Sequence, residues 1–180
     1  MKFEYIETDR LKLRIVTPDV MEYVYDVFTD DELMSFFGIT SPEVLEKEKH
    51  KFRNGLTTFN KSYLNFVIID KQTNTALGAC GYHTWYVEHD RAEIGYGLYN
   101  DTHKRKGYMS EAVAAMLAYG FNKMNLHRIE AMTADYNTAS IKILEKSGFV
   151  YEGRLREHYN VNGKMEDSVL YGLLKKDFEA

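Results

Sequence analysis

The segment Lys104-Arg105-Lys106-Gly107-Tyr108-Met109 lies where a predicted strand gives way to a helix, and it decides the fold. Three consecutive cations precede a glycine, and apolar residues then recur with helical spacing at positions 109, 112, 113, 116, 117 and 121. The first turn of a helix carries unpartnered amides and partial positive charge, and a glycine lets an anion approach the backbone. The alternative is a solvated charge run. Because other segments agree with the first interpretation, this junction predicts a phosphate-binding site.

Strand and helix signals lie on both sides of the junction. Period-two alternation and apolar runs predict strands over residues 11–15, 64–69, 76–87, 91–99, 128–133, 151–159 and 165–174. Caps and helical spacing predict helices over residues 18–28 and 42–57, one of about 17 residues from Tyr108, and one between Asn137 and Gly148. Residues 30–40 are typical of a loop, and Asn162-Gly163 predicts a type I′ hairpin turn.

The order of these elements predicts an α+β fold. Strands follow one another in the first half and alternate with helices later, which indicates a mixed, mostly antiparallel seven-stranded sheet with a central βαβ unit and flanking helices. The chain shows no internal repeat, low-complexity tract or linker that would divide it. We therefore expect a single domain over residues 1–180.

Composition excludes several classes of function. The 180 residues include 44% hydrophobic ones and carry a net charge of −4, so a basic nucleic-acid-binding surface is not expected. The single cysteine, Cys80, rules out an internal disulfide framework, and no Cys and His spacing indicates a metal site. No apolar stretch has the length of a membrane span. We expect a cytoplasmic protein that does not bind a membrane.

Two familiar phosphate motifs are missing. No glycine-rich run ends in Gly-Lys-Ser or Gly-Lys-Thr, so a P-loop is absent. Gly95-Tyr96-Gly97 lacks the third glycine of a dinucleotide fingerprint and lies inside a strand, which disfavours a nucleotide-dependent oxidoreductase. The glycine pair predicts instead a bulge or a close backbone approach, which would free backbone groups for an extended ligand.

Several segments, taken in order, resemble the Gcn5-related N-acetyltransferases. The chain is most similar to the Rim-type branch, which acetylates N-terminal amines of ribosomal proteins. The resemblance covers essentially the whole chain and implies acetyl-CoA as the acetyl donor and an amine as the acceptor. The segments are Thr8-Asp9-Arg10-Leu11, Ala92-Glu93-Ile94-Gly95-Tyr96, Gly107-Tyr108-Met109-Ser110-Glu111-Ala112, Asn137-Thr138-Ala139-Ser140 and Glu145-Lys146-Ser147-Gly148-Phe149.

The resemblance also implies where the coenzyme binds. The family's pyrophosphate loop has Arg or Gln, then Gly, then Gly or Ala, where this chain has Lys104, Gly107 and Met109; lysine keeps the charge, and methionine adds a side chain. The pantetheine arm would pair with the backbone like an added strand, and the pyrophosphate would rest on the amides of residues 105–109. The expected coenzyme-binding residues are Leu98, Tyr99, Lys104, Arg105, Lys106, Gly107, Tyr108, Met109 and Asn137.

Acetyl transfer requires a neutral amine, which is mostly protonated at pH 7, so a carboxylate base is needed. Glu93 matches the acid used as a base in the histone-acetylating branch, although a surface ion pair would also explain it. Glu88, Asp90 and Asp135 are weaker candidates. Many family members supply the proton for the departing thiolate from a tyrosine, where this chain has Leu144. Ser140, which resembles the serine proposed for the Rim-type branch, is the remaining candidate acid.

Several alternatives stay open. The acceptor is a protein N-terminus or a small amine such as a polyamine or an antibiotic, and a non-catalytic acyl-CoA-binding module is a rival interpretation. The terminal hairpin could pair within the monomer or across a homodimer. Cys80 is expected to be an inert core residue. His83 and Trp85 either line an acceptor cleft or form a half-buried pair, and the aromatic residues Tyr23, Tyr25, Phe36 and Phe37 either shape a pocket or pack between helices.

Overall fold

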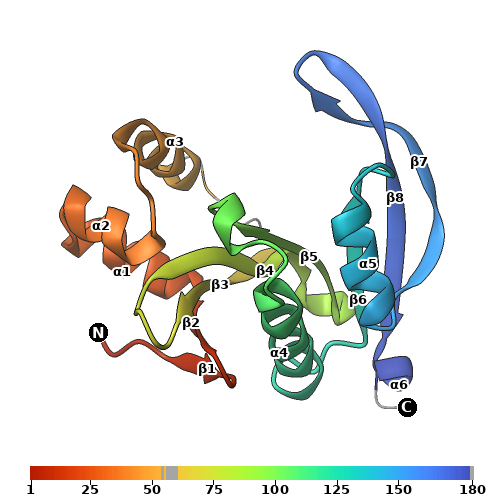
Figure 1. The fold of residues 1–180 in the computed structure, drawn as a ribbon, viewed down its shortest axis with the longest axis horizontal. Helices are drawn as coiled ribbons and strands as arrows, with labels where there is room; N and C mark the ends of the chain where they lie inside the picture. The colour runs from red at the N-terminus through yellow and green to blue at the C-terminus, as the bar shows by residue number, and fades with distance from the viewer. Residues whose placement is uncertain (54, 56–60, 179–180) are drawn as a thin grey trace.

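An eight-stranded sheet runs through the computed structural model, which describes residues 1–53, 55 and 61–178 (Figure 1). Every described neighbouring pair is antiparallel except β5 and β6, which are parallel and joined by the central helix. This arrangement confirms the predicted α+β fold with a central βαβ unit. Across the sheet the strands are β1 (Tyr5–Glu7), β2 (Leu11–Val16), β3 (Ser62–Asp70), β4 (Ala76–Tyr86), β5 (Arg91–Leu98), β6 (Arg128–Thr133), β8 (Lys164–Leu174) and β7 (Val150–Val161).

The predicted number of seven strands is wrong by one. The added strand is β1, three residues that pair with β2 in the register Tyr5↔Arg14 to Glu7↔Lys12. A segment this short shows no usable alternation, so its strand character comes from pairing with β2 rather than from its own sequence.

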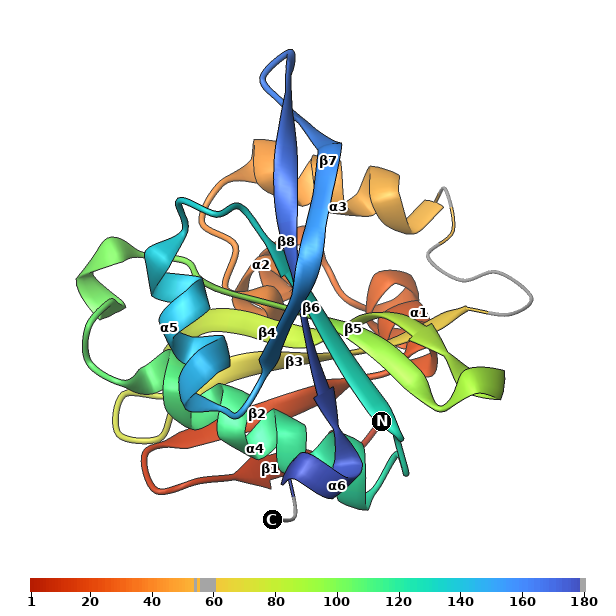
Figure 2. The same ribbon diagram turned by 90° about the vertical axis from the view of Figure 1, so that its right-hand side faces the viewer.

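Helices cover both faces of the sheet (Figures 1 and 2). On one face, α1 to α3 bury Val24, Leu33 and Leu45 against Val67 and Ile69 of β3. On the other face, α4 buries an apolar stripe with β2 to β6, joined by α5 and α6. None of the described helices is long and apolar enough to cross a membrane. The helices are α1 (Pro18–Val27), α2 (Asp30–Phe37), α3 (Pro42–Arg53), α4 (Tyr108–Asn122), α5 (Thr138–Lys146) and α6 (Lys175–Phe178).

Residues 30–40 are not the predicted loop, because α2 occupies most of them. Thr29 caps this helix, and Thr29 and Glu32 form a capping box in which each side chain accepts from the other's backbone amide. Gly38 ends the helix in the left-handed conformation, with φ 70°. These start and stop signals are present in the sequence, but the helix has only eight residues, of which Leu33 and Phe36 are buried.

The other predicted elements differ mainly at their ends. The predicted end of the second helix, near residue 57, lies outside the described residues, and α4 has 15 residues rather than about 17. Asn137 caps α5 as predicted, because its side chain accepts from the Ser140 amide. Asn162 and Gly163 both have positive φ, as the predicted hairpin turn requires. The hairpin of β7 and β8 rises beyond the body of the molecule (Figure 1).

The strands β5 and β6 separate part-way along their length. Their ladder runs from Arg91↔Arg128 to Ile94↔Ala131 and stops there, whereas β5 continues to Leu98. The register shift in this region lies in β4, between Tyr82 and Thr84, rather than at the glycine pair of β5. The separation leaves an opening in the middle of the sheet, directly before the basic loop.

Candidate active site

The opening between β5 and β6 contains a cavity of about 340 Å³. Glu93 and Tyr96 enter it from β5, and Asn137 and Ser140 enter it from the first turn of α5. The structure therefore brings the predicted base, Glu93, and the predicted acid, Ser140, to one cavity, although 47 positions separate them in the sequence (140 minus 93).

Glu93 lies in a largely buried environment, with its side chain 13% exposed. Burial raises the pKa of Glu93, His83 opposes that shift, and the negative charge of Glu130 adds to it. The Nε2 atom of His83 lies 3.5 Å from Oε1 of Glu93. A carboxylate with a raised pKa beside a cavity is a suitable acceptor for a proton from an amine.

Ser140 is joined to a residue that the sequence did not single out. The Tyr96 hydroxyl lies 2.8 Å from the Ser140 Oγ, and either group can be the donor. Burial raises the pKa of Tyr96, and the hydrogen bond with Ser140 opposes that shift. Leu144, where many family members have a tyrosine, is fully buried in the core. No local pattern indicates the pair, because 44 positions separate Tyr96 from Ser140.

The basic loop ends in a helix start without a side-chain cap. Gly107 is the N-cap of α4, in the left-handed conformation with φ 78°, and its position carries no capping side chain. The first amides of α4 are thus open to a ligand at the positive end of the helix dipole. Met109 is only 8% exposed and packs into the core, so its bulk does not cover the amides. These features fit a bound diphosphate, although the contact itself stays a prediction.

The remaining predicted loop residues have distinct positions. Arg105 has a positive φ of 60°, and Lys104 forms an ion pair of 2.6 Å with Asp101 on the preceding turn. Lys106 is exposed, and its carbonyl accepts from Arg10. The Tyr108 hydroxyl donates to Asp70 at 3.4 Å, which ties the start of α4 to the end of β3.

Arg10 holds this loop in place and was not predicted to do so. Its Nη1 donates to the Lys106 carbonyl at 2.9 Å, and its guanidinium lies 4.7 Å from the centre of the Tyr108 ring. Glu111 of α4 accepts from the Arg10 amide and Nε and from the Thr8 hydroxyl. Partial burial works to raise the pKa of Glu111, but these hydrogen bonds outweigh it and lower the pKa. The hairpin of β1 and β2 thereby fixes the helix start.

At the end of β5, one edge of the strand is hydrogen-bonded to β4 and the other edge faces the opening. The Tyr99 amide donates to the Leu77 carbonyl of β4 at 2.9 Å, so this group is not available to a ligand. Because successive backbone groups of a strand point to opposite sides, Leu98 directs its amide and carbonyl toward the opening. Of the two residues expected to pair with pantetheine, Leu98 therefore has the suitable orientation.

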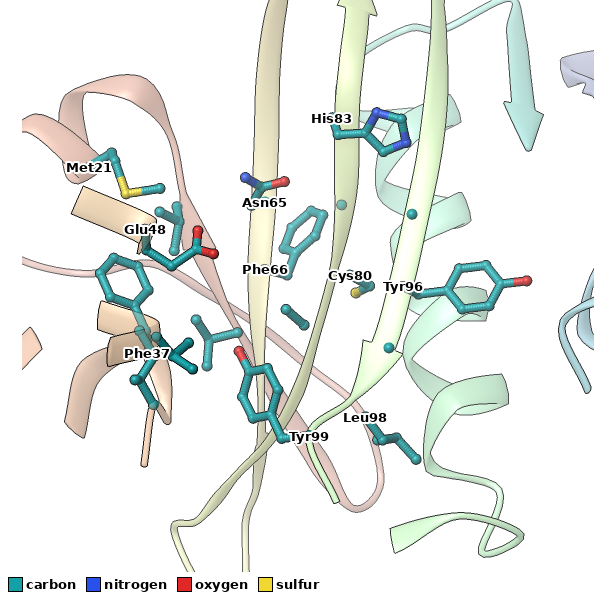
Figure 3. Close-up of a pocket in the computed structure, with 18 of the residues that line it drawn as sticks. Met21, Phe37, Glu48, Asn65, Phe66, Cys80, His83, Tyr96, Leu98 and Tyr99 are labelled. Carbon is teal, nitrogen blue, oxygen red and sulfur yellow. The ribbon is translucent and has the colours of Figure 1, made fainter. Parts of the chain in front are cut away.

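A second cavity, of about 500 Å³, lies between the sheet and α1 to α3 (Figure 3). Its walls are mostly apolar, with Met21, Phe37 and Tyr99 among the residues that point into it. Glu48 is the carboxylate and His83 the imidazole among the described residues of its wall, and Glu48 is paired with Lys51 at 2.6 Å. His83, Gly95 and Tyr96 belong to the walls of both cavities.

The structure gives the positions of the residues for which the sequence left two interpretations. His83 lines both cavities, whereas Trp85 packs against the core on the α4 side. Cys80 is buried, and burial raises the pKa of its thiol, in agreement with an inert core residue. The weaker base candidate Asp135 is ion-paired with Arg154. Within the described residues, no group of three or more His, Cys, Asp or Glu side chains could hold a metal ion.

Comparison with known proteins identifies the family. The model of the acetyltransferase (GNAT) domain matches residues 10–150. The chain belongs to the GNAT acetyltransferase family. GNAT acetyltransferases use acetyl-CoA, which is therefore the acetyl donor of this N-acetyltransferase.

Relatives of this GNAT chain span its whole length. The uncharacterized N-acetyltransferase YoaA of Bacillus subtilis (strain 168) is 33% identical over 174 residues, which cover 96% of this chain and 98% of YoaA. The crystal structure of a GNAT-family acetyltransferase from Bacillus anthracis is 29% identical, with a TM-score of 0.66, and covers 96% of this chain and 99% of its own.

Two solved GNAT structures with the same fold are named for different acceptors. One is the ribosomal-protein-S5-alanine acetyltransferase of Vibrio fischeri, with 22% identity, a TM-score of 0.65, and coverage of 98% of this chain and 100% of its own. The other is the spermidine N-acetyltransferase of Vibrio cholerae in complex with CoA and spermine, with 22% identity, a TM-score of 0.70, and coverage of 96% and 100%. At this identity the likeness establishes the fold and not the acceptor.

Proposed function

We propose that this N-acetyltransferase moves the acetyl group directly from acetyl-CoA to a primary amine, with Glu93 as the general base and Ser140 as the general acid. The observation that carries the proposal is the shared cavity, because Glu93 and Ser140 line the same cavity. A direct route needs no acyl-enzyme, and the buried Cys80 offers no accessible nucleophile.

The acceptor nitrogen loses two protons and gains one acetyl group. Glu93 takes a proton from the ammonium form of the acceptor, which leaves a neutral nitrogen with a free electron pair. That nitrogen attacks the thioester carbonyl, so the new N–C bond forms as the C–S bond breaks. Ser140, joined to the Tyr96 hydroxyl, gives its proton to the departing thiolate and takes the second proton from the acetylated nitrogen, so the Ser140 hydroxyl is restored. Holding both reactants in the split sheet supplies much of the acceleration by orientation.

The apolar cavity supports an acceptor whose amine is attached to an apolar group. A protein N-terminus with an apolar first side chain, or a small monoamine, would place that group against Met21 and Phe37. A polyamine carries several cations, whereas Glu48 is the carboxylate among the described residues of the cavity wall and is already paired with Lys51. The protein N-terminus is our first candidate, and a small amine is the second.

Amine-dependent release of CoA thiol tests this proposal. The purified protein with acetyl-CoA is assayed against a short peptide with an apolar N-terminal residue, an apolar monoamine and spermidine. We expect saturable release with the first two and weak release with spermidine. Binding of acetyl-CoA by calorimetry without any amine-dependent thiol release would contradict the enzyme and support the non-catalytic module.

A homodimer is a separate proposal. The strand β7 ends the sheet, and its large apolar side chains Val150, Tyr151 and Tyr159 are about half exposed. Pairing of this strand with a second copy would cover them. Light scattering after size exclusion that reports a mass near 21.0 kDa would contradict the dimer.

A further inference from the structure

A bulge in β4 directs His83 at Glu93. Tyr82 pairs with Ile94 and Thr84 pairs with Glu93, so two residues of β4 span one step of β5 and His83 is the extra residue. Its Nε2 lies 3.5 Å from Oε1 of Glu93, and its Nδ1 lies 3.1 Å from the Thr84 hydroxyl. Bulges often redirect a side chain beside a functional site.

Gly95 makes the space in which the imidazole lies. A Cβ atom at residue 95 would stand 2.9 Å from Cδ2 of His83 and 3.4 Å from its Nε2. Gly95 is absent from the residues with positive φ, so its backbone conformation does not itself require glycine. The missing side chain is therefore explained by the imidazole that occupies its place.

His83 also connects the buried carboxylate with solvent. Its side chain is 46% exposed, whereas that of Glu93 is 13% exposed. His83 lines both cavities and stands across the pocket from Glu48 and Phe37 (Figure 3). A proton taken up by Glu93 during acetylation must leave before the next turnover, and the imidazole lies on a short path outward.

We propose that His83 is a proton-relay residue that accepts the acceptor's proton from Glu93 and releases it to solvent. The inference rests on the proposed function. The proton on the Glu93 carboxyl moves to Nε2 of His83 as the O–H bond breaks and an N–H bond forms. The imidazolium then loses a proton to water and the ring returns to the Nδ1–H tautomer, so that Nε2 can accept again and Glu93 is again a carboxylate. Neutral histidine accepts on one nitrogen and donates from the other, which suits it to this transfer.

Other ionisable groups lie near His83 and Glu93. Arg91 of β5 is held by Glu130 of β6 at 2.9 Å, and His158 of β7 contacts the Ser168 hydroxyl at 3.1 Å. Neither Arg91 nor His158 lines the two cavities, whereas His83 lines both. The further ionisable groups facing the two cavities are Tyr159 of β7, Glu166 and Asp167 of β8, Tyr136 before α5, and Glu48, Tyr25, Tyr96 and Tyr99.

The test measures kcat at saturating acetyl-CoA for His83→Ala, with His89→Gln, a substitution on the exposed turn after β4, as the control. We expect kcat of His83→Ala to fall about 10- to 100-fold and to recover in part when imidazole is added to the buffer. The wild-type kcat should rise with pH on two ionisations and that of His83→Ala on one. The control should stay within about twofold.

Gly95→Ala is the second variant, because the added methyl group displaces the imidazole without removing it. Its kcat should fall about as far as that of His83→Ala. Unchanged kcat in both variants, or a loss in His83→Ala with an unchanged pH profile and no rescue by imidazole, would overturn the relay and leave the proposed function standing. A wild-type protein without amine-dependent thiol release would overturn both.

Discussion

The two cavities that meet at His83 differ in the chemistry of their walls. The cavity between β5 and β6 contains Glu93 and Ser140. The cavity beneath α1 to α3 is lined mainly by aliphatic and aromatic side chains such as Met21 and Phe37. Under the proposed function, the polar cavity carries out proton transfer and the apolar cavity selects the acceptor. Substitutions in each should therefore change different kinetic constants.

Glu93→Gln should produce the largest effect. Glutamine keeps the size of the side chain but cannot take a proton, so we expect kcat to fall by roughly 100-fold or more. Because burial raises the pKa of Glu93, and a base works only when ionised, the acidic limb of the wild-type kcat/KM profile should lie above the ordinary carboxyl value of 4.5. Steady-state rates from pH 4 to 9 measure the fall in kcat and the position of the acidic limb. Calorimetry with acetyl-CoA checks that the variant still binds the coenzyme. An unchanged profile would assign the base to another residue.

Gly107→Val should act on the coenzyme and leave proton transfer intact. Valine in the left-handed conformation costs roughly 1–2 kcal/mol. A Cβ at residue 107 would also lie 3.3 Å from Nη2 of Arg10. We expect the Kd for acetyl-CoA to rise about ten- to thirtyfold. Gly163→Val, which alters a left-handed glycine in the distant hairpin, is the matched control for backbone strain. Equal acetyl-CoA affinity of Gly107→Val and wild type would remove the phosphate site from this loop.

The expected coenzyme loop rests on local signals in the sequence. Cations, a glycine and an apolar helix pattern lie within a few residues of one another at the start of α4, and Asn137 caps α5 within its own turn. The fold class follows from similar local patterns. Arg10 was missed because it lies 96 positions from Lys106 of the loop and 101 positions from Glu111, and only folding brings them together.

The acceptor side depends on contacts that no local pattern contains. The bulge at His83 arises from the pairing of β4 with β5, and the Tyr96 and Ser140 hydroxyls meet across 44 positions. The helix α2 has its own capping residues, but its apolar face is stabilised only by the packing of Leu33 and Phe36 against the sheet. The sequence indicated Glu93 as a candidate base from its side-chain chemistry. The cavity beside Glu93 is formed by the tertiary structure and could not be predicted from the sequence.

Ser140→Ala and Tyr96→Phe should each have a smaller effect on kcat. A thiolate is a moderate leaving group that needs limited help from an acid, and a hydrogen bond to a charged group contributes about 1.5–3 kcal/mol. We expect each variant to lose roughly tenfold in kcat. The double variant should lose little more, because the two hydroxyls act as one unit. Rapid-mixing measurement of thiol release separates this step from product release, and an unaltered rate in Ser140→Ala would eliminate it as the acid.

Phe37→Leu should have the smallest effect, confined to the acceptor. The ring lies in the wall of the apolar cavity, and exchanging it for a smaller side chain removes part of the apolar surface offered to the acceptor (Figure 3). We expect KM for an apolar amine to rise about threefold, while kcat and the KM for acetyl-CoA stay near wild type. Phe3→Leu is the control, because Phe3 packs against Phe28 and Phe36 in the same aromatic cluster but outside the cavity wall. If Phe37→Leu and Phe3→Leu gave the same KM for apolar amines, the apolar cavity would not be the acceptor site. The proposed division of roles between the two cavities would then be wrong.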